Sequence, residues 1–225
     1  MNNIIQGDCL EELRKMEDNS IECIITSPPY NIGNMHSNTI QFGTYSGNNM
    51  NEQEYQQWQI DFLNECHRVL KEEGSMFYNH KIRIKDKKAI HPMEWLLKTN
   101  LILKQEIVWD MGKSANSDKI RFFPYSERIY WLVKNKETKI FNVESLSDVW
   151  RVVPKHKRKE IGHIAVMPVE IVENIIRATE YQKFLDPFAG SGTTGVACMH
   201  TGRNYVLIEK EPEYVEIIKK RLQVD

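Results

Sequence analysis

The chain has 225 residues, of which 41% are hydrophobic, 27% are charged and 10% are aromatic, and its formal net charge is −1. This composition suits one globular domain with a sizeable core and excludes a collagen-like chain, a coiled coil and a disordered tail. No apolar stretch reaches the roughly 18 residues that a membrane span needs, and the N-terminus lacks the basic and apolar regions of a signal peptide.

Short apolar strands alternate with amphipathic helices along the chain. Strands are predicted at residues 3–6, 21–25, 75–79, 101–109, 128–134, 183–186 and 204–208. Helices are predicted at residues 9–17, 55–70, 92–98, from Pro168 onward, 193–201 and 212–222. Gly74 is expected to end the second helix and Pro92 to occupy the first position of the third. The alternation predicts an α/β fold with a doubly wound, three-layered sheet.

Cysteine spacing bears on the compartment. Cys9, Cys23, Cys66 and Cys198 are widely separated, and no CxxC pair exists. The pattern therefore predicts neither a disulfide framework nor a zinc site, and it favours a reduced, cytoplasmic location. Cys198 is expected to be a core residue.

A glycine-rich turn follows the strand at 183–186. Gly190, Gly192 and Gly195 satisfy GxGxxG, and Glu209 follows 19 residues after Gly190. Such a turn lets backbone amides approach a ligand closely, and an acidic residue at about this distance holds ribose hydroxyls in nucleotide-binding βαβ units. The alternative is a tight strand-to-helix turn without a ligand. The combination of strand, helix and spaced acid favours a nucleotide site.

The position of this turn constrains the topology. Only 16 residues follow Glu209, enough for one helix. A doubly wound nucleotide fold needs further strands, so the N-terminal part must supply them. The order predicted from position is circularly permuted.

A second turn, in the sequence IECIITSPPYN at 21–31, places Ser27, Pro28, Pro29 and Tyr30 after an apolar strand. Two prolines remove two N–H donors, so that backbone carbonyls can point outward. Ligands bind at the carboxyl edge of open α/β sheets. The purely structural interpretation is a rigid turn after the strand with a packed tyrosine. The presence of the glycine turn in the same chain makes the combination of the two motifs a specific signal of function.

With both motifs in place, the chain resembles the DNA amino-methyltransferases that modify cytosine N4 or adenine N6. Ser27 to Tyr30 match the family's (Asp/Asn/Ser)-Pro-Pro-(Tyr/Phe) tetrapeptide, and Asp186 to Thr194 (DPFAGSGTT) match its S-adenosylmethionine loop. The catalytic motif comes first, as in the permuted β group. Asp8 resembles the contact near the cofactor's adenine, whereas Gly162–Pro168 departs from the family's HPAPFP segment. The resemblance covers nearly the whole chain.

The resemblance implies a Rossmann-like methyltransferase domain over residues 1–225. Its expected parts are a catalytic half at 1–134, a short target-recognition segment at about 135–162 and a cofactor-binding half at 163–225. With the spacing of the acid, it implies cofactor contacts at Asp8, Asp186, Pro187, Phe188, Ala189, Gly190, Ser191, Gly192, Thr193, Thr194 and Glu209.

The chemistry that the resemblance implies needs no metal and no covalent nucleophile. The Ser27 hydroxyl and the Pro28 carbonyl would hold the hydrogens of the exocyclic amine, whose lone pair becomes available when it pyramidalises. Tyr30 would stack on a base flipped from the duplex. An aromatic ring such as Phe188 or Tyr30 would favour the sulfonium of the cofactor.

The target base depends on Ser27. Members acting on adenine mostly carry Asp or Asn at this position, and serine is more typical of the cytosine-N4 group. The resemblance therefore favours cytosine N4, with adenine N6 as the alternative.

The charge distribution points to a polyanionic partner. Residues 1–80 have a balance of −8, residues 81–160 of +9 and residues 161–225 of −2. Two runs, at 81–88 and 151–159, hold five Lys or Arg each. Phosphate contacts are predicted at Lys81, Arg83, Lys85, Lys155, Lys157, Arg158 and Lys159. The alternative is that both runs are solvated loops.

Other classes of protein share part of this pattern. A nucleotide-binding oxidoreductase would share the glycine turn but leaves the Ser27–Tyr30 motif unexplained, and a non-catalytic nucleic-acid-binding module or an RNA or protein methyltransferase is a third interpretation.

The resemblance also allows a homodimer and a partner restriction endonuclease. Since the recognition segment is short, residues 31–51, expected as a long loop, and a second subunit are candidates for added DNA recognition. Trp109, Trp131 and Trp150 are expected in the core.

Overall fold

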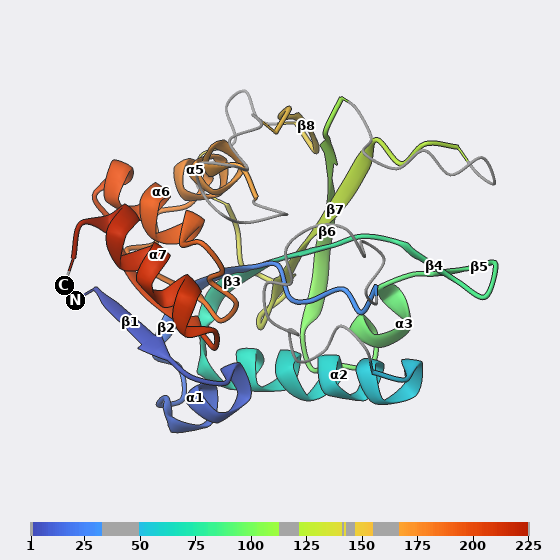
Figure 1. The fold of residues 1–225 in the computed structure, drawn as a ribbon, viewed down its shortest axis with the longest axis horizontal. Coiled ribbons are helices and arrows are strands. Elements are labelled where there is room, and N and C mark those ends of the chain that lie inside the picture. Colours follow the sequence, from blue (N-terminus) through green and yellow to red (C-terminus); the bar gives the residue numbers. More distant parts are fainter. Residues whose placement is uncertain are drawn as a thin grey trace.

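The computed structural model describes residues 2–32, 50–112, 122–140, 142, 147–154 and 167–224. The strands are β1 (Asn3–Gln6), β2 (Ile21–Thr26), β3 (Leu70–His80), β4 (Arg83–Lys85), β5 (Lys88–Ile90), β6 (Ile102–Asp110), β7 (Ser126–Val133), β8 (Val149–Arg151), β9 (Lys183–Asp186) and β10 (Asn204–Glu209). The helices are α1 (Cys9–Lys15), α2 (Glu52–Val69), α3 (Met93–Leu96), α5 (Val169–Ala178), α6 (Thr193–Thr201) and α7 (Pro212–Leu222). Figure 1 shows their arrangement.

One large sheet organises the described residues, with strand order β1-β10-β9-β2-β3-β7-β6-β8. The first five strands in this order, from β1 through β10, β9 and β2 to β3, run parallel to one another. Strand β7 pairs antiparallel with β3 and with β6, and β8 runs parallel to β6. The two long strands expected at 101–109 and 128–134 thus pair with each other. A separate two-stranded sheet, β4-β5, projects beyond the large sheet (Figure 1).

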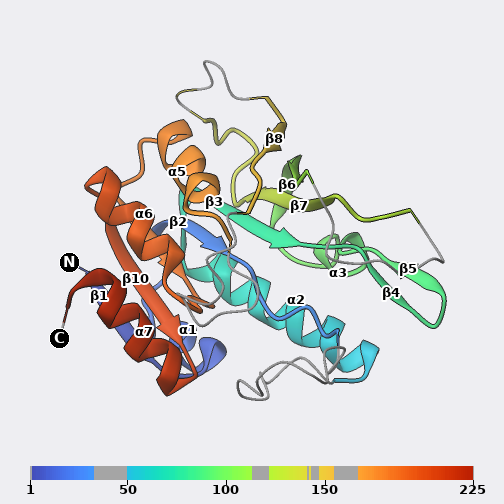
Figure 2. The same cartoon turned by 45° about the horizontal axis from the view of Figure 1, so that its top comes forward.

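Helices cover both faces of the sheet (Figure 2). Side chains alternate across a strand, so Ile24 and Leu185 face the core built with α1, α2 and α3, whereas Ile25 and Phe184 face the core built with α5, α6 and α7. The predicted three-layered α/β architecture is confirmed.

The last βαβ unit of the chain lies inside the sheet. Strand β9 pairs with β2, and β10 pairs with β1, so strands from the N-terminal part flank β9-α6-β10 on both sides. The prediction that N-terminal residues supply the remaining strands is confirmed. Circular permutation compares the order of elements in this chain with their order in another protein, and it stays a prediction.

Three details differ from the sequence-based expectations. Helix α2 ends at Val69, and Gly74 lies within β3, where a Cβ would come within 2.8 Å of the Glu22 carbonyl oxygen. Pro92 precedes α3 as its N-cap, and the helix is shorter than predicted. Strands β4, β5 and β8 were not expected, since three residues are too few to show a period.

The predictions that Trp109, Trp131, Trp150 and Cys198 lie in the core are confirmed. Trp109, Trp131 and Trp150 are between 4% and 7% exposed. Cys198 is buried, and the four cysteines are all free thiols in the core. No helix in the described part of the chain is long and apolar enough to cross a membrane.

Candidate active site

The carboxyl edge of the parallel strands brings the sequence motifs together. Asp186 ends β9, Glu209 ends β10, Ser27 follows β2 and Asp8 follows β1. Since these strands are neighbours in the sheet, residues up to about 200 positions apart meet at one edge.

The glycine turn between β9 and α6 uses its glycines for different reasons. Gly190 and Gly192 have φ of +51° and +82°, the left-handed region that side chains with a Cβ rarely adopt. A Cβ on Gly195 would come within 2.8 Å of Leu207 and 2.9 Å of Leu222. The first two glycines therefore shape the turn, and the third lets α6 pack closely on β10 and α7.

Asp186 organises this turn from within. Its Oδ1 accepts hydrogen bonds from the Thr26 hydroxyl at 3.0 Å and the Phe188 amide at 3.1 Å, and its Oδ2 accepts one from the Thr194 hydroxyl at 2.6 Å. Burial raises the pKa of Asp186 to about 6, because the charged form is desolvated. Asp186 thus ties the ends of β2 and β9 to the first turn of α6.

Glu209 holds the other side of the turn. Its two carboxylate oxygens accept the Gly190 amide at 2.7 Å and the Glu211 amide at 2.9 Å. Burial raises its pKa to about 7. A carboxylate has about four acceptor positions, so Glu209 keeps acceptor capacity for hydroxyl groups.

A small cleft of about 20 Å³ lies between the two turns. Its lining comprises Gly7, Asp8, Cys9, Pro29, Trp58, Pro187, Phe188, Glu209 and Lys210. The Phe188 ring is braced by Phe62 and Trp58, with ring centroids 5.0 Å and 5.7 Å away. The lining combines one aromatic wall with acidic groups, and its free volume has room for about one water molecule.

The remaining predicted cofactor residues complete the turn rather than the cleft. Ala189, Ser191, Thr193 and Thr194 are buried. Arg221 of α7 donates to the Ser191 carbonyl at 2.5 Å and to its hydroxyl at 3.0 Å. No sequence pattern indicates Arg221, because its contact spans 30 positions.

Asp8 has two roles in the structure. Its Oδ1 caps α1 by accepting the Leu10 amide at 3.0 Å, and its Oδ2 lies 3.3 Å from the Lys210 ammonium. Asp8 is therefore the N-cap of α1, and its carboxylate is also part of the cleft.

The Ser-Pro-Pro-Tyr turn is held by residues that the sequence did not identify. The Ser27 and Tyr30 hydroxyls lie 2.8 Å apart, and both donate toward Asn79 Oδ1, at 3.1 Å and 2.7 Å. Glu127 Oε2 lies 3.2 Å from the Tyr30 hydroxyl. Burial raises the pKa of Glu127 and of Tyr30. Four polar groups from β2, β3 and β7 thus form one cluster beside the cleft.

Asn79 and Glu127 carry no motif that would single them out. Their only available signal is position, at the end of one predicted strand and near the start of another. That these two ends meet depends on the antiparallel pairing of β3 with β7, in which Asn79 lies opposite Ile129.

A buried network supports the turn from behind. The Tyr55 hydroxyl donates to the Pro29 carbonyl at 2.7 Å, accepts from Gln59 Nε2 at 2.7 Å and lies 2.8 Å from His80 Nε2. His80 Nδ1 lies 2.8 Å from the Lys81 carbonyl, and burial lowers the pKa of His80 to about 3. Through Tyr55, helix α2 therefore holds the Ser-Pro-Pro-Tyr turn in place relative to β3.

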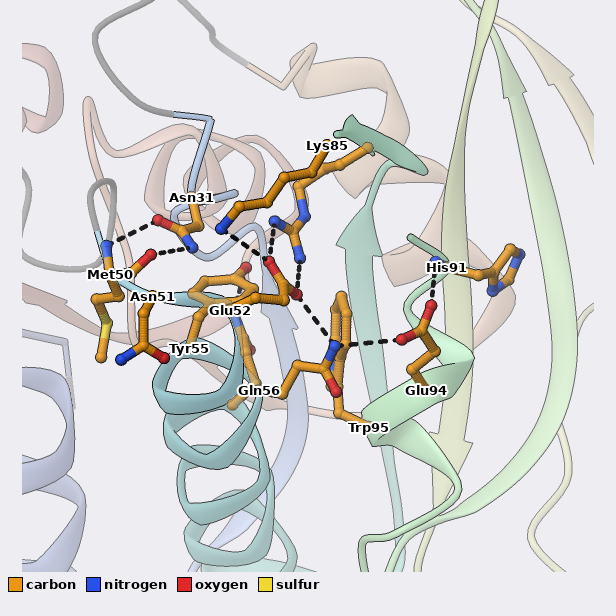
Figure 3. A network of polar contacts seen from close by, with 12 residues as sticks. Asn31, Met50, Asn51, Glu52, Tyr55, Gln56, Lys85, His91, Glu94 and Trp95 are labelled. Atoms are coloured by element: carbon orange, nitrogen blue, oxygen red, sulfur yellow. Dashed lines mark hydrogen bonds and ion pairs between the residues drawn. The ribbon is translucent and has the colours of Figure 1, made fainter. Parts of the chain in front are cut away.

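A second link joins the same turn to the start of α2 (Figure 3). The Asn31 side chain makes a reciprocal pair with the backbone of Met50, with both hydrogen bonds at 2.9 Å. Asn31 has φ of +52°, a conformation that asparagine tolerates better than most residues. These hydrogen bonds thus join the residue that follows Tyr30 to the residue that precedes the N-cap of α2.

Arg83 does not suit its predicted phosphate contact. Its side chain is 3% exposed, and its guanidinium makes two hydrogen bonds to Glu52, at 2.7 Å and 3.0 Å. It also lies over the Tyr55 ring, 4.7 Å from the centroid. The cause is local: Arg83 and Lys85, two positions apart, share one face of β4, and Glu52 offers that face a carboxylate that the guanidinium binds through two nitrogens.

Of the other predicted phosphate-binding residues, the structure describes Lys81 and Lys85 and leaves the rest undescribed. Lys85 is 40% exposed and lies 3.8 Å from Glu52. The Lys81 ammonium lies 5.2 Å from the centroid of the Tyr30 ring, beside the proposed base site. Lys155, Lys157, Arg158 and Lys159 lie outside the described residues, as do most of 31–51 and of the Gly162–Pro168 segment.

The fold and the site define a class of protein: an α/β enzyme that holds a nucleotide-containing cofactor beside a second, polar site. The chain belongs to the N6/N4 DNA methyltransferase family, because the model of that family, described as DNA methylase, matches residues 21–220. It is accordingly a DNA methyltransferase, and the resemblance stated from its two motifs is confirmed.

Relatives match over nearly the whole chain. The type II methyltransferase M.BglII of Bacillus subtilis is 28% identical over 96% of this chain and 68% of its own length. M2.MboI of Moraxella bovis is 29% identical over 97% and 86%. The DNA adenine methyltransferase YhdJ of Escherichia coli K12 is 28% identical over 98% and 82%.

Solved structures confirm the Rossmann-like methyltransferase fold. The PvuII DNA methyltransferase, described as cytosine-N4-specific, superposes with a TM-score of 0.81 at 22% identity, over 98% of this chain and 86% of that one. The M1.HpyAVI complex with S-adenosylmethionine gives 0.71 at 22% identity and covers all of both chains.

Proposed function

We propose that this methyltransferase modifies the exocyclic N4 amine of cytosine flipped from duplex DNA, with adenine N6 as the alternative target, and uses S-adenosylmethionine as methyl donor. The observation that carries the proposal is the Ser27 hydroxyl, held by Tyr30 and Asn79 in the turn whose Pro29 lines the cleft. A hydroxyl both accepts and donates a hydrogen bond. This donor suits cytosine, whose ring N3 acceptor adjoins the amine, and equally adenine, whose ring N1 does. The preference for cytosine therefore comes from the resemblance, since serine at this position is more typical of the cytosine-N4 group.

The chemistry of the cleft's lining, an aromatic ring and two carboxylates, supports the proposed cofactor. Glu209 would accept the ribose hydroxyls, Phe188 and Asp8 would contact the adenine, and the turn from Asp186 to Thr194 would approach the amino acid end. When bound, the cofactor supplies an electrophilic methyl group on a sulfonium. Pro29 lines the same cleft, so the catalytic turn adjoins the proposed cofactor site.

The catalytic turn would act on the amine by orientation. The Ser27 hydroxyl and the Pro28 carbonyl hold the amine hydrogens, and Tyr30 stacks on the base. Asn79 orients both hydroxyls. The amine loses one proton on methylation, and the Glu127 carboxylate, 3.2 Å from the Tyr30 hydroxyl, is a proton acceptor at the site.

The decisive experiment is digestion of treated DNA to nucleosides followed by mass spectrometry. N4-methylcytosine is expected in DNA incubated with protein and cofactor, and it should form more slowly with Tyr30→Ala, which loses ~1–3 kcal/mol of stacking. N6-methyladenine alone would overturn the assignment of the base. Binding of NAD in calorimetry, without binding of S-adenosylmethionine, would favour the oxidoreductase interpretation.

The wider context is also a proposal. Several relatives carry type II methyltransferase names, which supports a role beside a restriction endonuclease. We further propose the division into a catalytic half at 1–134, a recognition segment at about 135–162 and a cofactor-binding half at 163–225. A homodimer would supplement the short recognition segment, and sedimentation of the protein with and without DNA tests it.

A further inference from the structure

Exposed aromatic side chains gather in one short segment. Phe122, Phe123 and Tyr125 are 98%, 54% and 49% exposed. Among the described residues, every aromatic side chain in the exposed class lies in this segment, since the other exposed large hydrophobic residues are aliphatic. Contiguous exposed apolar surface in a soluble protein marks an interaction site.

The segment starts at the active site. The Tyr125 carbonyl accepts the Met111 amide at 2.8 Å, so the β6–β7 ladder continues as far as this residue. Glu127, two positions on, contacts the Tyr30 hydroxyl. At about 3.3 Å per residue, Tyr125 lies ~7 Å along the strand from Glu127, and Phe122 at most ~17 Å.

A basic hairpin projects on the same side of the molecule. Both views show the yellow-green segment that leads into β7 extending toward the side where β4 and β5 end (Figures 1 and 2). Lys87 and Lys88 are exposed at the hairpin tip, and Lys85 is 40% exposed. The Arg83–Glu52 pair anchors the hairpin to α2.

We propose that residues 122–125 form a base-contacting arm that packs against nucleobases next to the flipped nucleotide, while Lys85, Lys87 and Lys88 neutralise the adjoining phosphates. The inference deepens the proposed function, because it rests on base flipping at Tyr30. A flipped base leaves its neighbours unstacked, and aromatic rings stack on any base. The lysines favour DNA over a second copy of this chain as the occupant, since the patch combines exposed rings with positive charge.

Two variants separate the two contributions. Phe122→Ala with Phe123→Ala removes rings and no charge, whereas Lys87→Ala with Lys88→Ala removes charge and no ring. Binding to a fluorescein-labelled 40-base-pair duplex is measured at several salt concentrations. The aromatic variant should bind at least about fivefold more weakly with an unchanged salt slope. The lysine variant should lower the log–log slope by about 0.9 for each phosphate that is no longer neutralised.

Controls keep the result specific. Leu97→Ala removes a 73% exposed side chain just after α3 and should leave DNA binding unchanged. Affinity for S-adenosylmethionine should be the same in every variant, which shows that the fold is intact.

Three outcomes overturn the inference. Wild-type affinity for the duplex in the aromatic variant does so, and a change of sedimentation coefficient without a change in DNA affinity shows that the arm contacts a second copy instead. A lowered salt slope in the aromatic variant places the loss in charge and not in stacking. If the wild-type protein fails to bind the duplex at all, the proposed function itself is refuted.

Discussion

Asn79 is the residue whose role depends most on the structure. Its Oδ1 accepts from the Ser27 and Tyr30 hydroxyls, and its Nδ2 donates to the Arg128 carbonyl at 3.0 Å. Asn79→Ala leaves both hydroxyls without this acceptor, which costs ~1–3 kcal/mol. We expect kcat to fall about 10- to 100-fold while the affinity for S-adenosylmethionine stays the same.

The control for this substitution is Ser75→Ala on the same strand. Ser75 is buried and its hydroxyl accepts from Trp131 Nε1 at 3.0 Å, away from the catalytic turn. It should lower stability without a selective loss of kcat. Equal losses of kcat in the two variants would show that Asn79 only supports the strand.

Glu209 predicts a pH dependence of stability. Its pKa is about 7 in the folded state against an ordinary value of 4.5. The folded state therefore binds the proton more tightly, and the associated stabilisation is complete below about pH 4.5 and lost as the pH rises through 7. Glu209→Gln lacks this titration, so the unfolding free energy of wild type minus variant should fall with pH, by at most ~3 kcal/mol.

Urea unfolding at pH 5 and pH 8 measures this difference. Glu213→Gln, an exposed residue at the start of α7, is the matched control and should give parallel profiles. Parallel profiles for Glu209→Gln as well would mean that its carboxyl titrates normally.

At the scale of elements, the Arg83–Glu52 pair joins the β4–β5 hairpin to α2. Removing one partner leaves the other partly buried charge without compensation. Because Glu52 is 21% exposed, we expect Arg83→Ala to cost about 2 kcal/mol of unfolding free energy, below the ~3–5 kcal/mol of a fully buried pair. Arg83→Lys should not restore it, because lysine lacks the two-pronged geometry.

A double-mutant cycle with Glu52→Gln tests the coupling. Adding Arg83→Ala to that variant should cost markedly less than adding it to the wild type. Additive effects would show that the two side chains contribute independently, and that the hairpin is anchored by other contacts.

At the scale of the whole molecule, the positive middle third predicts salt-dependent DNA binding. Neutralising Lys155, Lys157, Arg158 and Lys159 together should reduce affinity and lower the log–log salt slope by about 0.9 for each phosphate left without its cation. The charge-matched control is a variant neutralised at Arg14, Lys15, Lys219 and Lys220. These residues lie in the last turns of α1 and α7, at the edge of the sheet opposite the candidate active site. An equal loss of slope in both variants would indicate a response to net charge alone.

The sequence by itself determined the fold class, the two turns and the family. Strand and helix periods are local, and GxGxxG and Ser-Pro-Pro-Tyr each need a particular backbone within a few residues. Short elements and chain reversals were less accessible: Gly74 was expected to end a helix, and instead lies in β3 because its small size lets the strand approach Glu22.

Only the tertiary structure decided which distant residues support the site. Asn79, Glu127 and Tyr55 reach the catalytic turn because β3 pairs antiparallel with β7 and α2 packs behind the sheet. It also turned Arg83 inward, away from its expected phosphate. Hydrogen bonds between strands carry no signature in the residues that they join, since register is set by packing across the sheet. The chemistry of the site can therefore be recognised from its motifs, whereas its supports depend on which strand ends meet.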